Sequence, residues 1–265
     1  METIWGVLPA GIIYLFTAIF GLCVGSFANV LIYRLPREES IVRPASRCPS
    51  CGRSIRPLEN IPVVSWIALG GRCRGCEAPI SVRYPLVEAA GGGLMIISVA
   101  VHGPGYAGLA YGLLYIALLA LTIIDIEHWL LPFGITVPLA FIGLLGAAFF
   151  GLRPLADSLL GMVVGFSTFM ILLAGGKALF KKDAMGGGDV AFGVMAGAFL
   201  GWKLTILMAF VASFLGVVAA LPLVLLGRGV AGRMMPFGPF LAAALVVCLL
   251  WGDRLVEGYM RLVGF

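Results

Sequence analysis

The feature that most constrains this chain is a succession of long apolar stretches separated by polar segments. A hydrocarbon core of about 30 Å requires roughly 20 apolar residues per helix. On that scale the sixth stretch, residues 189–202, is short, since its helix would rise only ~21 Å. Such a short element is tolerated where it lies among other helices. We therefore predict an all-α polytopic membrane protein with about eight transmembrane helices. The predicted spans are residues 5–33, 84–102, 106–124, 131–150, 157–176, 189–202, 204–226 and 237–251.

The composition supports a membrane protein rather than a soluble domain. Charged residues make up 12% of the chain and the mean hydropathy is +1.06, whereas soluble domains contain about 25% charged residues. A net charge of +5 would suggest a nucleic-acid partner, but most basic residues lie in loops beside apolar spans. That placement is typical of the positive-inside rule. We therefore expect contact with membrane lipid and no nucleic-acid partner.

The loop charges also predict an orientation. With eight spans and the N-terminus outside, fourteen basic residues fall on the inner side and four on the outer side, and the basic side is cytoplasmic. Merging the sixth and seventh spans would move Arg228 and Arg233 outside, so eight spans fit better. The N-terminal Met1-Glu2 lacks a basic region, and we do not expect a cleavable signal peptide.

Residues 34–83 are too polar and proline-rich to span a membrane, and they contain two cysteine pairs. Cys48-Pro-Ser-Cys51 and Cys73-Arg-Gly-Cys76 are separated by 21 residues, a spacing close to that of four-cysteine zinc sites. Two disulfides are the alternative, but thiols stay reduced in the cytoplasm. Iron bound by the same four thiolates is an alternative to zinc. We predict a small cytoplasmic domain with a structural zinc ion on Cys48, Cys51, Cys73 and Cys76.

Two acidic residues lie at the ends of predicted spans. Asp125 follows an apolar run at the inner end of the third span, and Asp189 follows three glycines and opens the sixth. The predicted topology places both carboxylates at the same membrane face. Two close carboxylates share one proton, so one can activate water while the other stabilises the developing oxygen charge. This arrangement predicts an aspartic peptidase.

Other interpretations of these acids stay open. Asp189 could cap a helix N-terminus, worth ~1 kcal/mol, and Asp125 could be an interfacial residue without a catalytic role. Glu127 and Asp183 are rival acids, although both sit further into polar loops. A proton-coupled transporter or channel could use the same Asp pair as a relay, but no inverted repeat is visible in the sequence.

Several segments resemble one family in the order in which they occur. Together they cover nearly the whole chain, and they resemble the prepilin peptidase (type IV leader peptidase) family, whose Gly-x-Gly-Asp region is shared with presenilin-like peptidases. The resemblance implies that Asp125 and Asp189 are the catalytic residues. The segments are Gly25–Pro36, Glu59–Trp66, Asp125–Pro132, Gly186–Asp189 and Met235–Phe240.

The resemblance also implies a substrate, a location and a second activity. Members cleave the short basic leader of type IV prepilins and type II secretion pseudopilins after a Gly, in the bacterial inner membrane. Many then N-methylate the new terminal residue, usually Phe, with S-adenosylmethionine. The cysteine-bearing loop is associated with methylation, but the sequence assigns no residues to binding the methyl donor. We divide the chain into a first transmembrane helix (1–33), a cytoplasmic zinc domain (34–83) and a seven-helix peptidase core (84–265).

Two positions depart from the family pattern. Lys commonly stands two positions after the second catalytic Asp, where this chain has Ala191, and Asp or Asn commonly follows Pro132, where this chain has Phe133. We expect these departures to affect substrate fit or the protonation of the pair. Ser26 and Asn29 lie inside the first span, where we expect hydrogen bonds between helices rather than catalysis.

Overall fold

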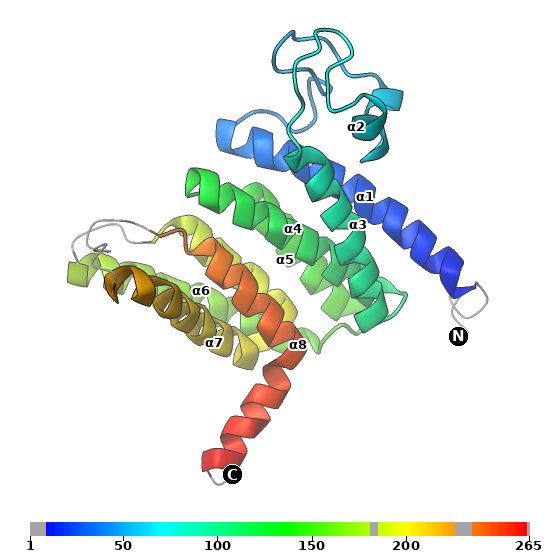
Figure 1. Ribbon diagram of the computed structural model, residues 1–265. Coiled ribbons are helices and arrows are strands. Elements are labelled where there is room, and N and C mark those ends of the chain that lie inside the picture. The colour runs from blue at the N-terminus through cyan, green and yellow to red at the C-terminus, as the bar shows by residue number, and fades with distance from the viewer. Residues whose placement is uncertain (1–8, 181–184, 226–234, 264–265) are drawn as a thin grey trace. The chain divides into compact units, whose positions relative to one another are not determined.

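The structure is a computed structural model that describes residues 9–180, 185–225 and 235–263 (Figure 1). Within these ranges β-pairing is limited to two isolated bridges, which confirms the predicted all-α class. The helices are α1 Ala10–Arg34, α2 Val64–Ala68, α3 Arg83–His102, α4 Tyr106–His128, α5 Phe133–Phe149, α6 Leu155–Phe180, α7 Gly187–Leu225 and α8 Gly238–Val263, with short 3₁₀ helices η2 Leu35–Arg37 and η3 Pro57–Glu59.

Among the described residues, six helices are long and apolar enough to cross a membrane, and α5 is a shorter apolar helix of 17 residues. The chain is a multi-pass membrane protein, as predicted. Three helices end later than expected. Helix α4 continues to His128, so Asp125 lies in its last turns, α6 continues to Phe180 and α8 continues to Val263. None of these extensions contains a proline that would end a helix.

The predicted sixth and seventh spans together form α7, which is interrupted at Gly201. This residue has φ 70° and ψ 176°, which is not helical. In a straight helix Asp189 and Gly216 would lie ~40 Å apart. Instead, Gly216 lies beside Phe237, next to the start of α8, and the first residue of α8 is hydrogen-bonded to Asp125, whose charge also acts on Asp189. Helix α7 therefore turns back at Gly201, and its two arms correspond to the two predicted spans.

The turn in α7 frees backbone carbonyls that a continuous helix would have bonded. In a membrane such groups must find partners within the protein. Side chains of α7 itself, of α6 and of the segment leading into α6 supply them. The bonds are Ser158 Oγ to Ala198 O (3.0 Å), Arg153 Nε to Phe199 O (3.2 Å) and Thr205 Oγ1 to Gly201 O (2.6 Å). Arg153 is also paired with Asp157 at 2.9 Å. Side chains thus bond the carbonyls of Ala198, Phe199 and Gly201 at the turn.

The first arm of α7 packs against α6 along a seam of glycines. A Cβ atom added to Gly165 would collide with the carbonyl of Gly193, and one added to Gly161 would collide with the carbonyl of Gly197. Small residues at a spacing of four let membrane helices approach closely, where packing rather than the hydrophobic effect drives association. The seam therefore fixes the arm that begins with Asp189.

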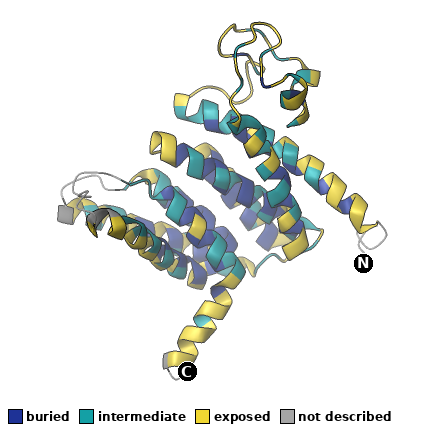
Figure 2. Cartoon of the chain, viewed as in Figure 1, coloured by how far each residue is buried: buried dark blue, intermediate teal, exposed yellow. Residues whose placement is uncertain are grey.

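Packing divides the chain into two compact units, with the boundary between Ala120 and Leu121 inside α4. In the first unit Asn29 Nδ2 on α1 donates to the carbonyl of Tyr84 on α3 at 3.1 Å, which is the interhelical bond expected for Asn29. The second unit contains α5 to α8 and both predicted catalytic residues. The last turns of α8 are largely exposed (Figure 2).

Replacing Gly165 with Leu should separate α6 from the first arm of α7. Overpacking of a tight interface costs typically 1–3 kcal/mol, so we expect a lower melting temperature in detergent. Gly175→Leu on the same helix is the matched control, because no atom lies within 4 Å of a Cβ there. Equal melting temperatures for the two variants would show that the seam does not stabilise the protein.

Candidate functional site

Asp125 is a buried carboxylate in the last turns of α4, with 6% of its surface exposed. Its Oδ2 accepts a hydrogen bond of 2.7 Å from the backbone N–H of Gly238, the first residue of α8. The first N–H groups of a helix have no partner within the helix, and they favour negative charge. A Cβ atom at position 238 would lie 2.8 Å from the same oxygen, so the bond depends on glycine.

Asp189 lies at the start of α7, where three glycines precede it. Its Oδ2 accepts a 3.0 Å hydrogen bond from the N–H of Gly186, just before the helix begins. Asp189 therefore has the capping role considered from the sequence. Gly188 packs so closely on Leu131 that an added Cβ would meet the Leu131 carbonyl at 2.5 Å. Glycine thus lets the start of α7 approach the segment between α4 and α5.

The structure brings Asp125 and Asp189 together within the second unit, close enough for their charges to interact. Each carboxylate is held by a backbone N–H at the start of a helix, α8 for Asp125 and α7 for Asp189. Two close carboxylates retain one proton between them. Such a pair can activate a water molecule and protonate an oxygen or a leaving amine at the same site.

The rival acids differ from this pair. Glu127 has a 40% exposed side chain, and its carboxylate lies 3.9 Å from His128 Nε2. Asp183 lies outside the described residues, as do the loop cations Lys181, Lys182, Arg228 and Arg233. Of the predicted acids whose placement is described, Asp125 and Asp189 are the two that the fold holds in one site.

The second predicted site, the cysteine cluster, is assembled by two similar turns. The four sulfur atoms all lie within 4.8 Å of one another. In the first turn Cys48 N donates to Arg53 O, and in the second Cys73 N donates to Ala78 O, both at 2.9 Å. The isolated bridges Arg47–Ser54 and Arg72–Pro79 close these turns. Each cysteine pair therefore sits on its own knuckle.

The cluster has dimensions that suit a zinc ion. Zn–S bonds of about 2.3 Å in a tetrahedron place sulfur atoms ~3.8 Å apart, and the Sγ atoms of Cys48 and Cys76 lie 3.8 Å apart. All four cysteines are free thiols, so neither predicted pair is a disulfide. The donor set fits zinc, and four protein ligands would leave no open position for catalysis.

The thiols of Cys48 and Cys76 differ in acidity. Hydrogen bonds from the N–H groups of Cys51 and Ser50 lower the pKa of Cys48 to about 6. At Cys76 the N–H of Ala78 lowers the pKa, but desolvation and the neighbouring thiols outweigh it and raise the pKa to about 12. Four thiolates can share this space only around a cation, because their charges otherwise repel.

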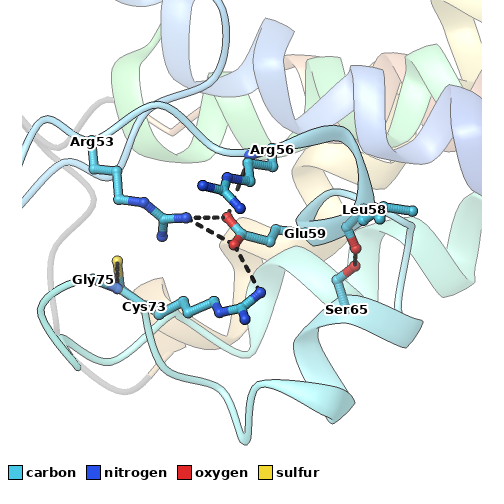
Figure 3. Close-up of polar contacts among 8 residues, drawn as sticks. Arg53, Arg56, Leu58, Glu59, Ser65, Cys73 and Gly75 are labelled. Atoms are coloured by element: carbon cyan, nitrogen blue, oxygen red, sulfur yellow. Dashed lines mark hydrogen bonds and ion pairs between the residues drawn. The ribbon is translucent and has the colours of Figure 1, made fainter.

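Glu59 joins the two knuckles, a role that the sequence did not reveal (Figure 3). Its carboxylate receives two bonds from Arg53 Nη2, at 2.8 and 2.9 Å, and lies 3.5 Å from Arg74 Nη1. Arg53 follows the first cysteine pair and Arg74 lies inside the second. Arg53 holds the pKa of Glu59 below its usual range. This charge is therefore fully present at pH 7 and is lost only as the pH falls through that lowered pKa.

Comparisons with known proteins agree with the predicted resemblance. Residues 19–102 match the bacterial peptidase A24 N-terminal domain, and residues 112–221 match the type IV leader peptidase family. The chain belongs to the type IV leader peptidase family. The first matched segment contains the Gly25–Pro36 and Glu59–Trp66 motifs, and the second contains Asp125 and Asp189.

Curated relatives extend over most of the chain. A prepilin leader peptidase/N-methyltransferase of Aeromonas salmonicida is 37% identical over 92% of this chain and 93% of its own length. One from Pseudomonas aeruginosa is 38% identical over 94% of each. One from Myxococcus xanthus is 43% identical over 84% of this chain, which spans 66% of that relative. No solved structure gives a significant match.

The two departures from the family pattern lie together in the fold. Phe133 and Ala191 both line a single cavity of about 620 Å³ in the second unit. One wall of this cavity is the first turn of α7, which holds Asp189. Sequence alone could not reveal this proximity, because 57 positions separate the two residues in the chain.

Replacing Glu59 with Gln should weaken metal retention by the cysteine cluster. The variant keeps the shape of the side chain but loses the charge that pairs with Arg53 and Arg74. Loss of groups that support metal ligands typically reduces affinity 10- to 100-fold, and we expect roughly tenfold here. The measurement is metal per chain after dialysis of the purified protein against a series of chelator concentrations at pH 7.5.

Glu39→Gln is the control, because Glu39 is an exposed residue of the same loop. We expect this control to retain about one metal ion per chain, like the wild type, in accordance with a single four-ligand site. If Glu59→Gln also retained its metal at every chelator concentration, the ion-pair link between the knuckles would have no role in the site.

Proposed function

We propose that this chain is a bacterial inner-membrane prepilin leader peptidase whose catalytic pair is Asp125 and Asp189. The observation that carries the proposal is the placement of these two carboxylates, which come from α4 and α7, lie near enough for their charges to interact and are each held by a backbone N–H at a helix start. The relatives that span more than nine-tenths of the chain are named prepilin leader peptidases/N-methyltransferases, which supports the same activity.

The reaction is hydrolysis of one peptide bond. The ionised carboxylate of the pair takes a proton from water, and the oxygen of that water attacks the scissile carbonyl carbon. The protonated carboxyl donates to the carbonyl oxygen as negative charge develops there. When the C–N bond breaks, the leaving amine takes the proton that the first carboxylate had accepted. The pair then shares one proton again.

The proposed substrates are type IV prepilins or type II secretion pseudopilins, cut where their short basic leader meets an apolar helix. The basic loops support a cytoplasmic active site and a periplasmic N-terminus, in accordance with the positive-inside rule. Residues 34–83 contain nine of the eighteen basic residues, which favours the cytoplasm for that segment. The division into a first transmembrane helix (1–33), a cytoplasmic zinc domain (34–83) and a seven-helix peptidase core (84–265) stays a prediction.

The proposal includes a structural zinc ion and a second activity. Cys48, Cys51, Cys73 and Cys76 would hold the zinc, which would stabilise a loop too small to form its own core. The relatives named as N-methyltransferases support methylation of the new N-terminal amine. S-adenosylmethionine supplies the methyl group, and the amine loses a proton. The zinc has no part in either reaction.

Asp125→Asn and Asp189→Asn should each abolish cleavage of a prepilin by the detergent-purified enzyme. Neither amide can take up or give a proton as a carboxyl does, so we expect a loss of at least about 10⁴-fold in kcat. The measurement is the appearance of mature pilin by mass spectrometry. With labelled S-adenosylmethionine present, the same assay reports methylation of the product.

Both variants must melt like the wild type for the comparison to hold. Full activity in either variant would refute the pair and direct attention to Glu127 and Asp183. Cleavage without methyl transfer would refute the second activity alone. If the wild type cleaved no prepilin or pseudopilin, the transporter or channel interpretation of the Asp pair would replace the peptidase.

Gly238→Ala should reduce cleavage without unfolding the protein. The added methyl group would press on the Asp125 carboxylate, because a Cβ there lies 2.8 Å from Oδ2 and 3.0 Å from Cγ. Misplacement of a reacting group by about 1 Å costs on the order of 100-fold. The control is Gly258→Ala on the same helix, where no atom lies within 4 Å of the new Cβ. We expect kcat to fall in the first variant only, and equal values would show that this contact does not position Asp125.

A further inference from the structure

A cavity of about 620 Å³ lies in the second unit, among α5, α6 and the first arm of α7. Its lining is apolar except for Thr136, whose hydroxyl oxygen lies 3.4 Å from the carbonyl of Pro132. Helix α5 contributes Phe133 and Val137, α6 contributes Phe166, and α7 contributes Val194. We call this cavity the apolar groove. It is large enough to hold several apolar side chains.

The apolar groove begins beside Asp189, one member of the candidate catalytic pair. Gly187, Val190 and Ala191 form part of its lining, and they flank Asp189 in the first turn of α7. From Gly187 to Val194 the groove follows α7 for about 10 Å, at 1.5 Å per residue. That length matches two turns of a helix, or three to four residues of extended chain. A peptide bond held at Asp189 therefore lies within one helical turn of an apolar channel.

The groove is partly open to the surroundings of the protein. Phe133, Val137 and Phe166 are 57%, 43% and 49% exposed, so a segment can enter from the side. In a bilayer a lipid chain would make similar apolar contacts, since lipid is as apolar as these side chains. A substrate differs from lipid in one respect: its scissile bond fixes it at Asp189. Once the scissile bond is held at Asp189, binding of the neighbouring substrate segment in the groove is intramolecular. The position of each substrate residue along the groove is then fixed.

We infer that the apolar groove binds the apolar segment of the prepilin that directly follows the scissile bond. This inference rests on the proposed function. The basic leader then lies on the other side of the carboxylate pair, outside the groove. The groove would set the register of cleavage, because a large apolar side chain next to the scissile bond fits it and a charged one does not.

Filling the groove tests the inference by kinetics. Val194→Trp and Val137→Trp place a large side chain in the groove from α7 and from α5. The control is Val217→Trp on the second arm of α7, an exposed position (65%) outside the groove. We expect kcat/KM for a prepilin peptide to fall at least about tenfold in the two filled variants and to stay unchanged in the control.

A second peptide, with alanine in place of the first large apolar residues after the scissile bond, makes the test specific. Wild type should prefer the apolar peptide, and the filled variants should lose that preference. Melting temperatures confirm folding, and Val137→Trp serves if Val194→Trp does not fold. Equal kinetics for the filled and control variants, or an unchanged preference, would overturn the inference.

Photo-crosslinking separates failure of this inference from failure of the proposed function. A benzophenone side chain in the apolar segment of an intact prepilin is illuminated with the Asp125→Asn variant, and the attachment sites are mapped by mass spectrometry. We expect attachment to α5, α6 and the first arm of α7. Attachment to α8 or to the second arm, or no attachment, would overturn the groove. Absence of cleavage by wild type would overturn the function, and the crosslinks would still decide the groove.

Discussion

Within a bilayer a backbone polar group must find its hydrogen-bond partner inside the protein. The turn of α7 at Gly201 interrupts the helix and leaves backbone carbonyls that need such partners. Ser158, Arg153 and Thr205 bond the carbonyls that the turn frees. With the turn satisfied, α7 can run back beside itself, and its two arms reach the same end of the second unit. The glycine seam with α6 then fixes the arm that begins with Asp189. Without this reversal, Asp189 and the start of α8 would lie far apart.

The carboxylate pair depends on helix starts rather than on neighbouring cations. No cation partner for Asp125 or Asp189 is present among the described ion pairs, whereas each accepts a backbone N–H at the start of a helix. A helix start carries only a partial positive charge, so it can hold a carboxylate without committing it permanently to the ionised form. That balance suits the proton exchange that the proposed mechanism assigns to the pair. The cysteine loop is stabilised differently, by the full charges of Arg53, Glu59 and Arg74.

Much of this arrangement could be predicted from local patterns. Length and polarity predicted the spans, spacing predicted the cysteine cluster, and the shared membrane face predicted that Asp125 and Asp189 would meet. The contacts that complete the sites could not be predicted, because they join residues far apart without any periodic signal. Gly238 bonds Asp125 across 113 positions, and Phe133 and Ala191 line one cavity only because of how the helices pack. The sequence left open whether Asp189 caps a helix or acts with Asp125. In the structure its carboxylate accepts the N–H of Gly186 and also lies near enough to Asp125 for their charges to interact, so the two roles are compatible.

The shortness of the first arm of α7 has a consequence for how the protein is made. From Gly187 to Gly201 the arm rises ~21 Å, less than the ~30 Å hydrocarbon core, so it cannot hold itself across a bilayer alone. It needs the glycine face of α6, which the ribosome delivers first because α6 precedes α7 in the chain. The arm therefore depends on α6 already being in the membrane. We therefore expect the arm to reach its final position only after α6 has inserted, so that the order of synthesis sets the order of assembly.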